Sequence, residues 1–387
     1  MSRDAPCIFV VAGEPSGDAL GGRLMAALQD LTQGRARFVG VGGAAMTAQG
    51  LDSLFPMEEL SVMGLAEVLP HLPRLIRRVR QTAAEIDAVS PDVVVTIDAP
   101  SFAQAVVKRI RNRAIPKIHY VAPTVWAWRP WRVRKIRRHF DMVLALLPFE
   151  PPFFERAGVR CAFVGHPVVE YGVMQGDGAG FRRRHLISPE DTLICVLPGS
   201  RRGEVSRLAA EFGRTLALLA QNRPGVRAVV PTVPGVAGLV KRLAADWPVP
   251  VVVVEDSDEK YAAMAASNAA IAASGTVALE LGLAGVPSVI AYRLTPVTAL
   301  LLRFLVRVRF ANLLNLILDL AVVPERLQAD CSADILAADV EALLGPAGAA
   351  QIAELRPALA ALGIEGEPPS RRAARAVLEA IGYDSCK

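Results

Sequence analysis

At 387 residues, of which 52% are hydrophobic and 21% charged, the chain is long enough for two globular domains and too apolar to be disordered. Its formal net charge of +5 is a modest excess, compatible with an anionic substrate, a membrane surface or nucleic acid, and selects none of them. The five cysteines are scattered singly, which argues against a disulfide framework and a zinc site, so we expect reduced thiols in a cytosolic protein.

The first apolar run ends at Gly13 and is too short for the hydrophobic region of a signal peptide, so it predicts a β-strand. No uncharged apolar stretch reaches about 18 residues, the length that a transmembrane helix needs. Even the most apolar segment, near Leu300, is interrupted by Arg303 and Arg307. Any membrane contact is therefore expected to be peripheral.

Short apolar runs that end in Gly, Asp or Pro alternate with stretches of helical period, which is typical of βα units and a parallel sheet. The runs are CIFVVAG, ARFVGVGG, DVVVTIDAP, PKIHYVAP, MVLALLP and CAFVGHP, then TLICVLPGS, VRAVVPT, VPVVVVE, AAIAASG and PSVIAY. They predict two doubly wound α/β domains, residues 1–170 and 181–345, with a loose Gly-rich connection at 171–180. The tail after Ala333 has helical spacing, interrupted from Gly366 to Pro369.

Two consecutive Rossmann-like domains without a GxGxxG motif resemble the GT-B architecture, in which donor nucleotide and acceptor meet in a cleft between the domains. This resemblance implies that a C-terminal helix at about residues 370–387 crosses back to the first domain. Ligands of open parallel sheets sit outside the carboxyl ends of the strands, so the loops that follow the strands are where we look for chemistry.

The first such loop, AGEPSGDALGG, is a Gly-rich turn into a helix whose free N–H groups can face an anion. Its candidate ligands for a UDP-sugar are Gly13, Ser16 and Gly17. The alternative is a tight turn in which Ser16 or Asp18 caps the helix.

Two segments combine apolar or aromatic side chains with arginines, which suits a membrane interface and anionic lipid phosphate. In the first, Pro70 and Pro73 argue against one continuous core helix. In the second, WAWRPWRVRKIRR, the aromatics also suit nucleic acid, and the alternative is core tryptophans beside a solvated basic helix. The candidate membrane or acceptor contacts are Met63, Leu65, Val68, Leu69, Leu72, Leu75, Trp126, Trp128, Arg129 and Arg132.

Asp98 ends the apolar run VVVTI and is followed by Ala99 and Pro100. A carboxylate at the end of a strand can act as a general base toward an attacking hydroxyl. From position alone, the competing interpretation is that Asp98 caps the next helix.

The motif LPGSRRGEV offers groups that neutralise a phosphate leaving group. Gly199 permits a sharp turn, Ser200 can cap, and Arg201 or Arg202 can present a bidentate fork to phosphate oxygens. Two arginines at a helix N-terminus are disfavoured by the helix dipole, which favours an anionic partner over two solvated side chains. We assign Arg201 a catalytic role and Arg202 a binding role.

Further candidates for the UDP-sugar site follow later strands. His166 in VGHP ends a strand, and ASGTVALE places three small residues at another strand-to-helix turn. Asn312 of FANLLN, with Glu325 and Gln328 of VPERLQ, forms a second rank, with a cap and a solvated helix face as alternatives. The small residues are Ser274, Gly275 and Thr276.

The ordered series AGEPSGD, VGGAAM, MGLAEVLPHLPRL, IDAPSFAQ, HYVAPTVWAWR, LLPFE, FVGHP, LPGSRRGEV, ASGTVALE, ANLL and VPERLQ resembles the lipid-A-disaccharide synthase family, glycosyltransferase family 19. The series spans roughly residues 8–331. Ser101, Ala103 and Ala311 depart from the Asp, Asn and Pro that are usual in the family.

The resemblance implies an inverting hexosyltransferase that joins UDP-2,3-diacylglucosamine to 2,3-diacylglucosamine 1-phosphate through a β(1→6) bond and releases UDP. It implies that Asp98 is the base and that Glu280 bonds the ribose hydroxyls, against a capping carboxylate as the alternative. It places the enzyme at the cytoplasmic face of a bacterial inner membrane, with a homodimer as a further partner. Neither a cofactor nor a metal is expected.

Two other classes of protein stay open at this point. A UDP-sugar 2-epimerase of GT-B fold would share the nucleotide site but has no need of the surface rich in Trp and Arg. A non-enzymatic module that binds nucleic acid or membrane would explain WAWRPWRVRKIRR, but not Asp98 together with LPGSRR and ASGTVALE. We expect no nucleic-acid partner.

Overall fold

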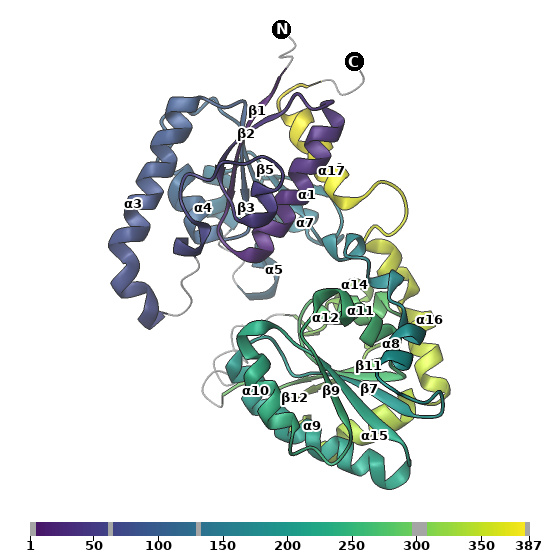
Figure 1. The fold of residues 1–387 in the computed structure, drawn as a ribbon. Coiled ribbons are helices and arrows are strands. Elements are labelled where there is room, and N and C mark those ends of the chain that lie inside the picture. Colours follow the sequence, from purple (N-terminus) through teal and green to yellow (C-terminus); the bar gives the residue numbers. More distant parts are fainter. Residues whose placement is uncertain (1–4, 61–64, 129–132, 296–307, 384–387) are drawn as a thin grey trace. The chain divides into compact units, whose positions relative to one another are not determined.

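The computed structural model describes residues 5–60, 65–128, 133–295 and 308–383, and for residues 65–70, 127, 128 and 258 it describes the backbone only. The chain forms two compact units (Figure 1). The first unit comprises Met1–Pro167 with Glu365–Lys387, and the second comprises Val168–Ile364.

The first unit is built on a parallel six-stranded sheet in the order β2-β1-β3-β4-β5-β6. Its strands are β1 (Cys7–Ala12), β2 (Arg37–Val41), β3 (Val93–Ile97), β4 (Lys117–Tyr120), β5 (Met142–Ala145) and β6 (Arg160–Phe163). All six coincide with apolar runs predicted from the sequence. The runs are nearly continuous because a parallel sheet is covered on both faces.

Alternate residues of β1 enter two different cores. Ile8 and Val10 pack on the side of α1, whereas Phe9 and Val11 pack on the side of α3 and α4. Each fully buried side chain of this kind contributes about 1.5–3 kcal/mol. The helices of this unit are α1 (Pro15–Leu31), α2 (Ala44–Thr47), η1 (Met57–Leu60), α3 (Leu65–Val89), α4 (Pro100–Val107), α5 (Val125–Trp128), α6 (Val133–His139), α7 (Pro151–Glu155) and α17 (Pro369–Ala380).

The helix α17 belongs to the first unit although it ends the chain. Ala373, Ala374, Val377 and Leu378 are buried in the same core as the inner face of α1. Figure 1 shows α17 beside α1. The last helix of the chain, α17, is therefore packed against the first, α1, through an apolar face.

The structure corrects our expectation that Pro70 and Pro73 interrupt their helix, because α3 runs continuously from Leu65 to Val89. Proline removes one amide donor and kinks a helix but need not end it. The later turns are anchored by Val79 and Ile86 in the core, which holds the helix beyond the prolines.

The second unit holds another parallel six-stranded sheet, in the order β12-β11-β10-β7-β8-β9. Its strands are β7 (Thr192–Leu197), β8 (Val226–Pro231), β9 (Val251–Val254), β10 (Ala269–Ala273), β11 (Ser288–Tyr292) and β12 (Glu325–Leu327). The first five were predicted. The sixth was missed because its three residues lie in VPERLQ and form no apolar run.

The helices of the second unit cover both faces of this sheet (Figure 1). They are α8 (Gly178–Arg184), α9 (Arg202–Asn222), α10 (Pro234–Ala244), α11 (Ser257–Ala265), α12 (Val277–Leu283), α14 (Leu313–Leu318), α15 (Ala333–Leu343) and α16 (Pro346–Ala361), with short 3-10 turns η3 (Pro167–Glu170), η4 (Val173–Gln175) and η5 (Gln328–Asp330). The helix α16 lies in the tail that was expected to be helical, but the break at Gly345 that separates it from α15 was not predicted.

The expected loose connection at residues 171–180 is instead structured. Asp177 caps α8 by accepting a hydrogen bond from the amide of Gly180 at 2.8 Å. Phe181 is fully buried, and the guanidinium of Arg182 donates to the carbonyl of Ala266 at 2.9 Å. The sequence did not predict this structure, because a Gly-rich composition is also typical of a flexible linker.

Among the described helices, none is long and apolar enough by itself to cross a membrane. The helices α15 and α16 meet that criterion of length and composition only as a pair, with a bend of 80° between them.

Candidate functional site

Asp98 lies at the carboxyl end of β3 in a strained turn. Its φ is 52° and that of Ala99 is 43°, so two consecutive non-glycine residues adopt the left-handed region. The amide of Asp98 donates to the carbonyl of Tyr120 at 3.0 Å, and its Oδ1 accepts from the amide of Ala99 at 2.9 Å. Such strain persists where the surroundings enforce it and is concentrated at active sites.

The Asp98 side chain does not cap the following helix. Ala99 is the N-cap of α4 and contributes no side-chain bond. The carboxylate is partly exposed, with Ser16 Oγ donating to Oδ2 at 3.4 Å. The capping alternative therefore fails, and the Asp98 side chain keeps room for another partner.

The turn after β1 packs directly behind this carboxylate. A Cβ on Gly13 would come within 2.8 Å of the Cβ of Ala99, so only glycine allows this approach. Gly17 similarly faces the carbonyl of Ile97. The structure thus places Gly13, Ser16 and Gly17, our candidate ligands of a UDP-sugar, beside Asp98 in the first unit.

Asp18 ties this turn to the next one instead of capping its own helix. Its Oδ1 accepts from the amides of Gly43 at 2.7 Å and Met46 at 3.0 Å, and its Oδ2 accepts from Ala45 at 2.9 Å. The N-cap of α1 is Glu14, whose side chain does not cap the helix. The alternative of a self-capped turn is therefore wrong.

The neighbouring strand end is strained as well. Val121 follows β4 with a φ of 79°, which is unusual for a β-branched residue. Its amide donates to the carbonyl of Leu144 at 3.1 Å. Since the preceding carbonyl, that of Tyr120, receives the amide of Asp98, the two strained turns are linked through the backbone.

Trp126 is held by a buried carboxylate. Its Nε1 donates to Oε1 of Glu150 at 3.1 Å, while Oε2 accepts from the amides of Leu146 and Leu147 at 3.1 and 3.0 Å. Burial raises the pKa of Glu150 to about 7, against the opposing effect of these hydrogen bonds. The indole N–H that we expected at a membrane or acceptor is therefore already satisfied within the first unit.

The structure describes only some of the other residues that we predicted to contact the membrane or the acceptor. Leu72 is 46% exposed, and Leu75 is partly buried. Met63, Arg129 and Arg132 lie outside the described residues. The side chains of Leu65, Val68, Leu69 and Trp128 also lie outside them.

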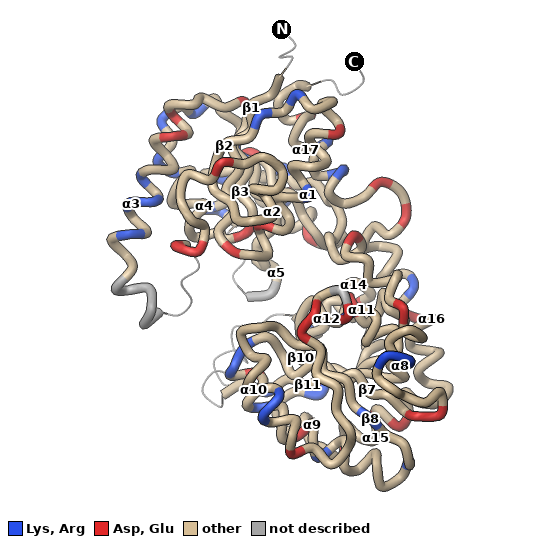
Figure 2. The backbone as a smooth tube through the Cα atoms, in the orientation of Figure 1, with Lys and Arg blue, Asp and Glu red and all other residues tan. Residues whose placement is uncertain are grey.

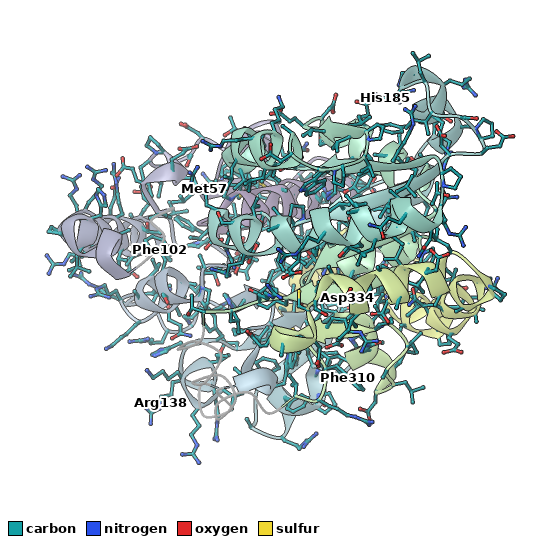
Figure 3. The ribbon with its side chains drawn as sticks, turned by 90° about the horizontal axis from the view of Figure 1, so that it is seen from below. Met57, Phe102, Arg138, His185, Phe310 and Asp334 are labelled. Carbon is teal, nitrogen blue, oxygen red and sulfur yellow. The ribbon has the colours of Figure 1, made fainter. Side chains whose placement is uncertain are left out.

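Basic residues line the surfaces near these segments. Figure 2 shows basic residues recurring along α3, and the sequence of this helix makes all of them arginines. On α6, Ile136 is buried while Arg134, Lys135 and Arg137 are exposed. Arg138 is exposed too, and Figure 3 shows its side chain extending outward. The helix α6 therefore contacts the core through Val133 and Ile136 and presents a cationic outer surface.

His166 follows β6 and is buried. Burial lowers its pKa to about 4. The imidazole is therefore neutral at neutral pH and brings no positive charge to a phosphate. A neutral hydrogen bond is the role that its surroundings allow.

The second unit contains a cavity of about 380 Å³ at the carboxyl ends of β7, β8 and β10. Seven residues predicted from two separate motifs line it together. They are Gly199, Ser200, Arg201, Ser274, Gly275, Thr276 and Glu280. Arg202 begins α9 and is exposed, but it does not line this cavity.

The Gly199 turn presents Arg201 to the cavity. Gly199 has a φ of 111°, and a Cβ there would lie 2.5 Å from Oε2 of Glu204. Glu204 accepts from the Arg201 amide at 3.3 Å and lies 3.5 Å from its Nη1. The Arg201 side chain is nonetheless 72% exposed. Its guanidinium is thus lightly held and available to an anion.

Glu280 faces a cation that sequence reasoning missed. Lys260 Nζ lies 2.8 Å from Oε1 and 2.6 Å from Oε2 of Glu280, and the Tyr261 hydroxyl lies 3.5 Å from Oε1. The pair joins α11 to α12 at the cavity wall. The available signal was a lysine in the loop and helix after the predicted strand VPVVVVE, where no motif drew attention to it.

Asn312, Glu325 and Gln328 support the loops beside the cavity and do not line it. Asn312 is fully buried and caps α14, its Oδ1 accepting from Leu314 at 2.8 Å. Glu325 accepts from the amides of Ala311 at 2.7 Å and Asn312 at 3.1 Å. Gln328 accepts from the amide of Leu294 at 3.4 Å.

One hydrogen bond connects these supporting loops to a residue that lines the cavity, and one further residue holds the loops together. Ser274 Oγ donates to the carbonyl of Ala311 at 3.2 Å. Asn315, which we did not predict, donates to Glu325 and to the carbonyl of Val323, each at 2.8 Å. No pattern in the sequence distinguishes such a polar hub from a surface asparagine.

Within the part of the chain that the structure describes, no group of three or more His, Cys, Asp and Glu side chains is arranged to hold a metal ion. The charged groups that line the cavity are Arg201, Lys260, Glu204 and Glu280, two of each sign.

The chain matches the family model described as lipid-A-disaccharide synthetase over residues 8–356. It is 55% identical over 378 residues to a lipid-A-disaccharide synthase of Rhodospirillum centenum, covering 97% of this chain and 94% of that protein. It is 50% identical over 380 residues to one of Paramagnetospirillum magneticum, covering 97% of each.

Solved structures of similar fold include a UDP-GlcNAc 2-epimerase from Neisseria meningitidis bound to UDP-GlcNAc, with a TM-score of 0.60, 12% identity and coverage of 96% of this chain and 98% of that one. Another is MurG of Acinetobacter baumannii, with a TM-score of 0.56, 13% identity and coverage of 97% and 99%. At such low identity the likeness shows the fold alone. The prediction of two Rossmann-like domains of GT-B type is confirmed.

Proposed function

The chain belongs to the lipid-A-disaccharide synthase family, and on this premise we propose that its two units divide the reaction, the second holding the UDP-sugar donor and the first supplying the base. The enzyme is a glycosyltransferase of lipid A biosynthesis. In the family's reaction UDP-2,3-diacylglucosamine and 2,3-diacylglucosamine 1-phosphate give the β(1→6)-linked disaccharide 1-phosphate and UDP.

The cavity of the second unit carries the assignment of the donor site. Its volume of about 380 Å³ suits a small-molecule ligand, and it lies where open parallel sheets bind nucleotides. Arg201 supplies a guanidinium that is 72% exposed and can meet the diphosphate. Glu280 supplies a buried carboxylate for the ribose hydroxyls. The cavity thus offers a cation to the diphosphate and a carboxylate to the ribose hydroxyls of one nucleotide.

Asp98 is proposed as the base. The 6-hydroxyl of the acceptor attacks the anomeric carbon of the donor, the bond from that carbon to the phosphate oxygen breaks, and the hydroxyl proton passes to the Asp98 carboxylate. The electron pair of the broken bond leaves with UDP, whose charge Arg201 stabilises. The strained turn at Asp98 supports this role because it holds a partly exposed carboxylate at the strand end.

The assay that tests this function measures release of UDP and formation of the disaccharide from synthetic donor, with and without acylated acceptor. Release that depends on the acceptor, together with the disaccharide, is the expected result. A change of configuration at C2 of the donor without any acceptor would identify an epimerase instead. Absence of both reactions would leave a binding protein.

We further propose that α3 contacts the cytoplasmic face of the inner membrane. Leu72 is 46% exposed and Ile76 is 38% exposed, and Arg74, Arg77 and Arg80 are exposed beside them. The substrates carry acyl chains whose transfer into water costs about 0.8 kcal/mol per CH₂, so an apolar surface at the bilayer is needed. Each arginine near anionic headgroups contributes about 1 kcal/mol.

The test is Leu72→Ser combined with Ile76→Ser, measured by flotation with vesicles that contain anionic lipid. Binding and activity on membrane-embedded substrate should fall, while activity on short-chain soluble analogues and the melting temperature stay unchanged. Leu320→Ser is the matched control, since Leu320 is 60% exposed in the second unit. A large loss of melting temperature would show that these leucine and isoleucine side chains serve packing. The homodimer stays a prediction.

A further inference from the structure

Two ion pairs of described residues line the donor cavity. The pair of Lys260 with Glu280 is shorter and less exposed than that of Arg201 with Glu204, which is 3.5 Å long with side chains 72% and 11% exposed. The side chains of Lys260 and Glu280 are only 29% and 10% exposed. The Nζ atom lies within 2.8 Å of both carboxylate oxygens. Lys241 and Glu255 form a comparable pair on the surface, where the side chains are 58% and 41% exposed.

The Glu280 carboxylate keeps acceptor capacity in spite of this pair. An ionised carboxylate has about four lone-pair sites. The lysine takes one site on each oxygen, and the Tyr261 hydroxyl makes only a long contact of 3.5 Å with Oε1. One site is therefore left on Oε2, and the second site on Oε1 is taken only by the long bond from Tyr261, so two adjacent hydroxyls of a ribose can approach the two oxygens.

The ammonium also fixes how the carboxylate is presented. By bridging both oxygens it sets the plane of the carboxylate, and it compensates a charge that is costly to bury alone. An amide in that place would offer one acceptor oxygen in place of two. The direction in which the remaining lone pairs point thus depends on Lys260.

Accepting the proposed donor site, we propose that Lys260 is a positioning residue that orients Glu280 toward the two ribose hydroxyls and so makes the enzyme select ribonucleotide donors. Lys260 remains bound to Glu280 when the nucleotide binds. Lys260 should therefore raise the affinity only for nucleotides that carry both hydroxyls.

Calorimetric titration with UDP and with 2′,3′-dideoxy-UDP tests this inference. The unaltered enzyme should prefer UDP by about tenfold or more, as expected for hydrogen bonds to a charged group. Lys260→Met should remove most of that preference by weakening UDP binding, with little effect on the dideoxy nucleotide. Lys260→Arg should restore part of it, and Lys241→Met, the matched surface control, should change neither affinity.

Three results would overturn the inference. Equal weakening of both nucleotides in Lys260→Met would place the ammonium on the diphosphate. An unchanged preference would make the pair a purely structural contact. Equal affinity of the unaltered enzyme for both nucleotides would remove the ribose contact itself. If Lys260→Met does not fold, Lys260→Gln is titrated in its place. Failure of the unaltered enzyme to bind UDP at all would instead refute the proposed donor site.

Discussion

Replacing Asp98 by asparagine tests the proposed base most directly, because the structure indicates that little else changes. Asparagine tolerates the left-handed φ of 52° better than most residues. Its Oδ1 can still accept from the amide of Ala99, and its amide group can face Ser16 Oγ, which lies 3.4 Å from Oδ2. Alanine would lose both contacts and add strain.

The expected loss is large and confined to turnover. A general base contributes about 10² to 10⁴ in rate, which corresponds to about 3–5 kcal/mol of activation free energy. The assay compares kcat from UDP release, UDP affinity by calorimetry, and melting temperature. We expect kcat to fall by that factor, with UDP affinity and melting temperature unchanged.

Asp141→Asn is the matched control, since Asp141 lies at the amino end of β5, away from the carboxyl ends of the strands where Asp98 lies, and its Oδ2 accepts from the amide of Lys117 at 2.8 Å. It should leave kcat unchanged. A kcat of Asp98→Asn within about threefold of the unaltered enzyme, below the range that a general base supplies, would refute the assignment.

Arg201→Ala should weaken UDP binding by about tenfold to a hundredfold, the effect of one charged hydrogen bond, and more than Arg202→Ala does; equal effects would contradict the orientation of Arg201 into the cavity. Because the folded-state pKa of Glu150 is raised from 4.5 to about 7, its contribution to stability is full below pH 4.5 and is lost as the pH rises to about 7, by about 3 kcal/mol. Glu150→Gln should therefore flatten the fall of unfolding free energy across this window. A pH profile identical to that of the unaltered enzyme would show that Glu150 does not cause the fall. Val121→Gly relieves the strain of a φ of 79°, but glycine raises the conformational entropy of the unfolded chain. The two effects oppose each other, so the unfolding free energy should change by only about 1 kcal/mol. Its kcat should fall if this turn holds Asp98, and an unaltered kcat would show that the strain is merely tolerated.

Local patterns were sufficient to predict every described strand except β12. Eleven apolar runs became strands because a sheet covered on both faces needs continuous hydrophobic segments. The motifs LPGSRRGEV and ASGTVALE were expected at strand ends, and the structure brings residues of both to one cavity. Adjacent carboxyl ends in a parallel sheet make this meeting predictable, although contact with a donor stays a prediction.

Other features arose only from tertiary contacts. The helix α3 continues past Pro70 and Pro73 since its later turns are packed on the sheet. Glu325 bonds amides 13 and 14 residues away, which no local pattern records.

The sequence by itself determined the two parallel sheets and the type of chemistry at their strand ends, because hydrophobic period and charge are properties of short segments. Only the tertiary structure decided that Asp98 sits in a left-handed turn, that Trp126 is bound by Glu150, and that Lys260 meets Glu280. These pairings join residues 20 or more positions apart. Their energies depend on burial, and burial of a side chain is set by every element that packs around it.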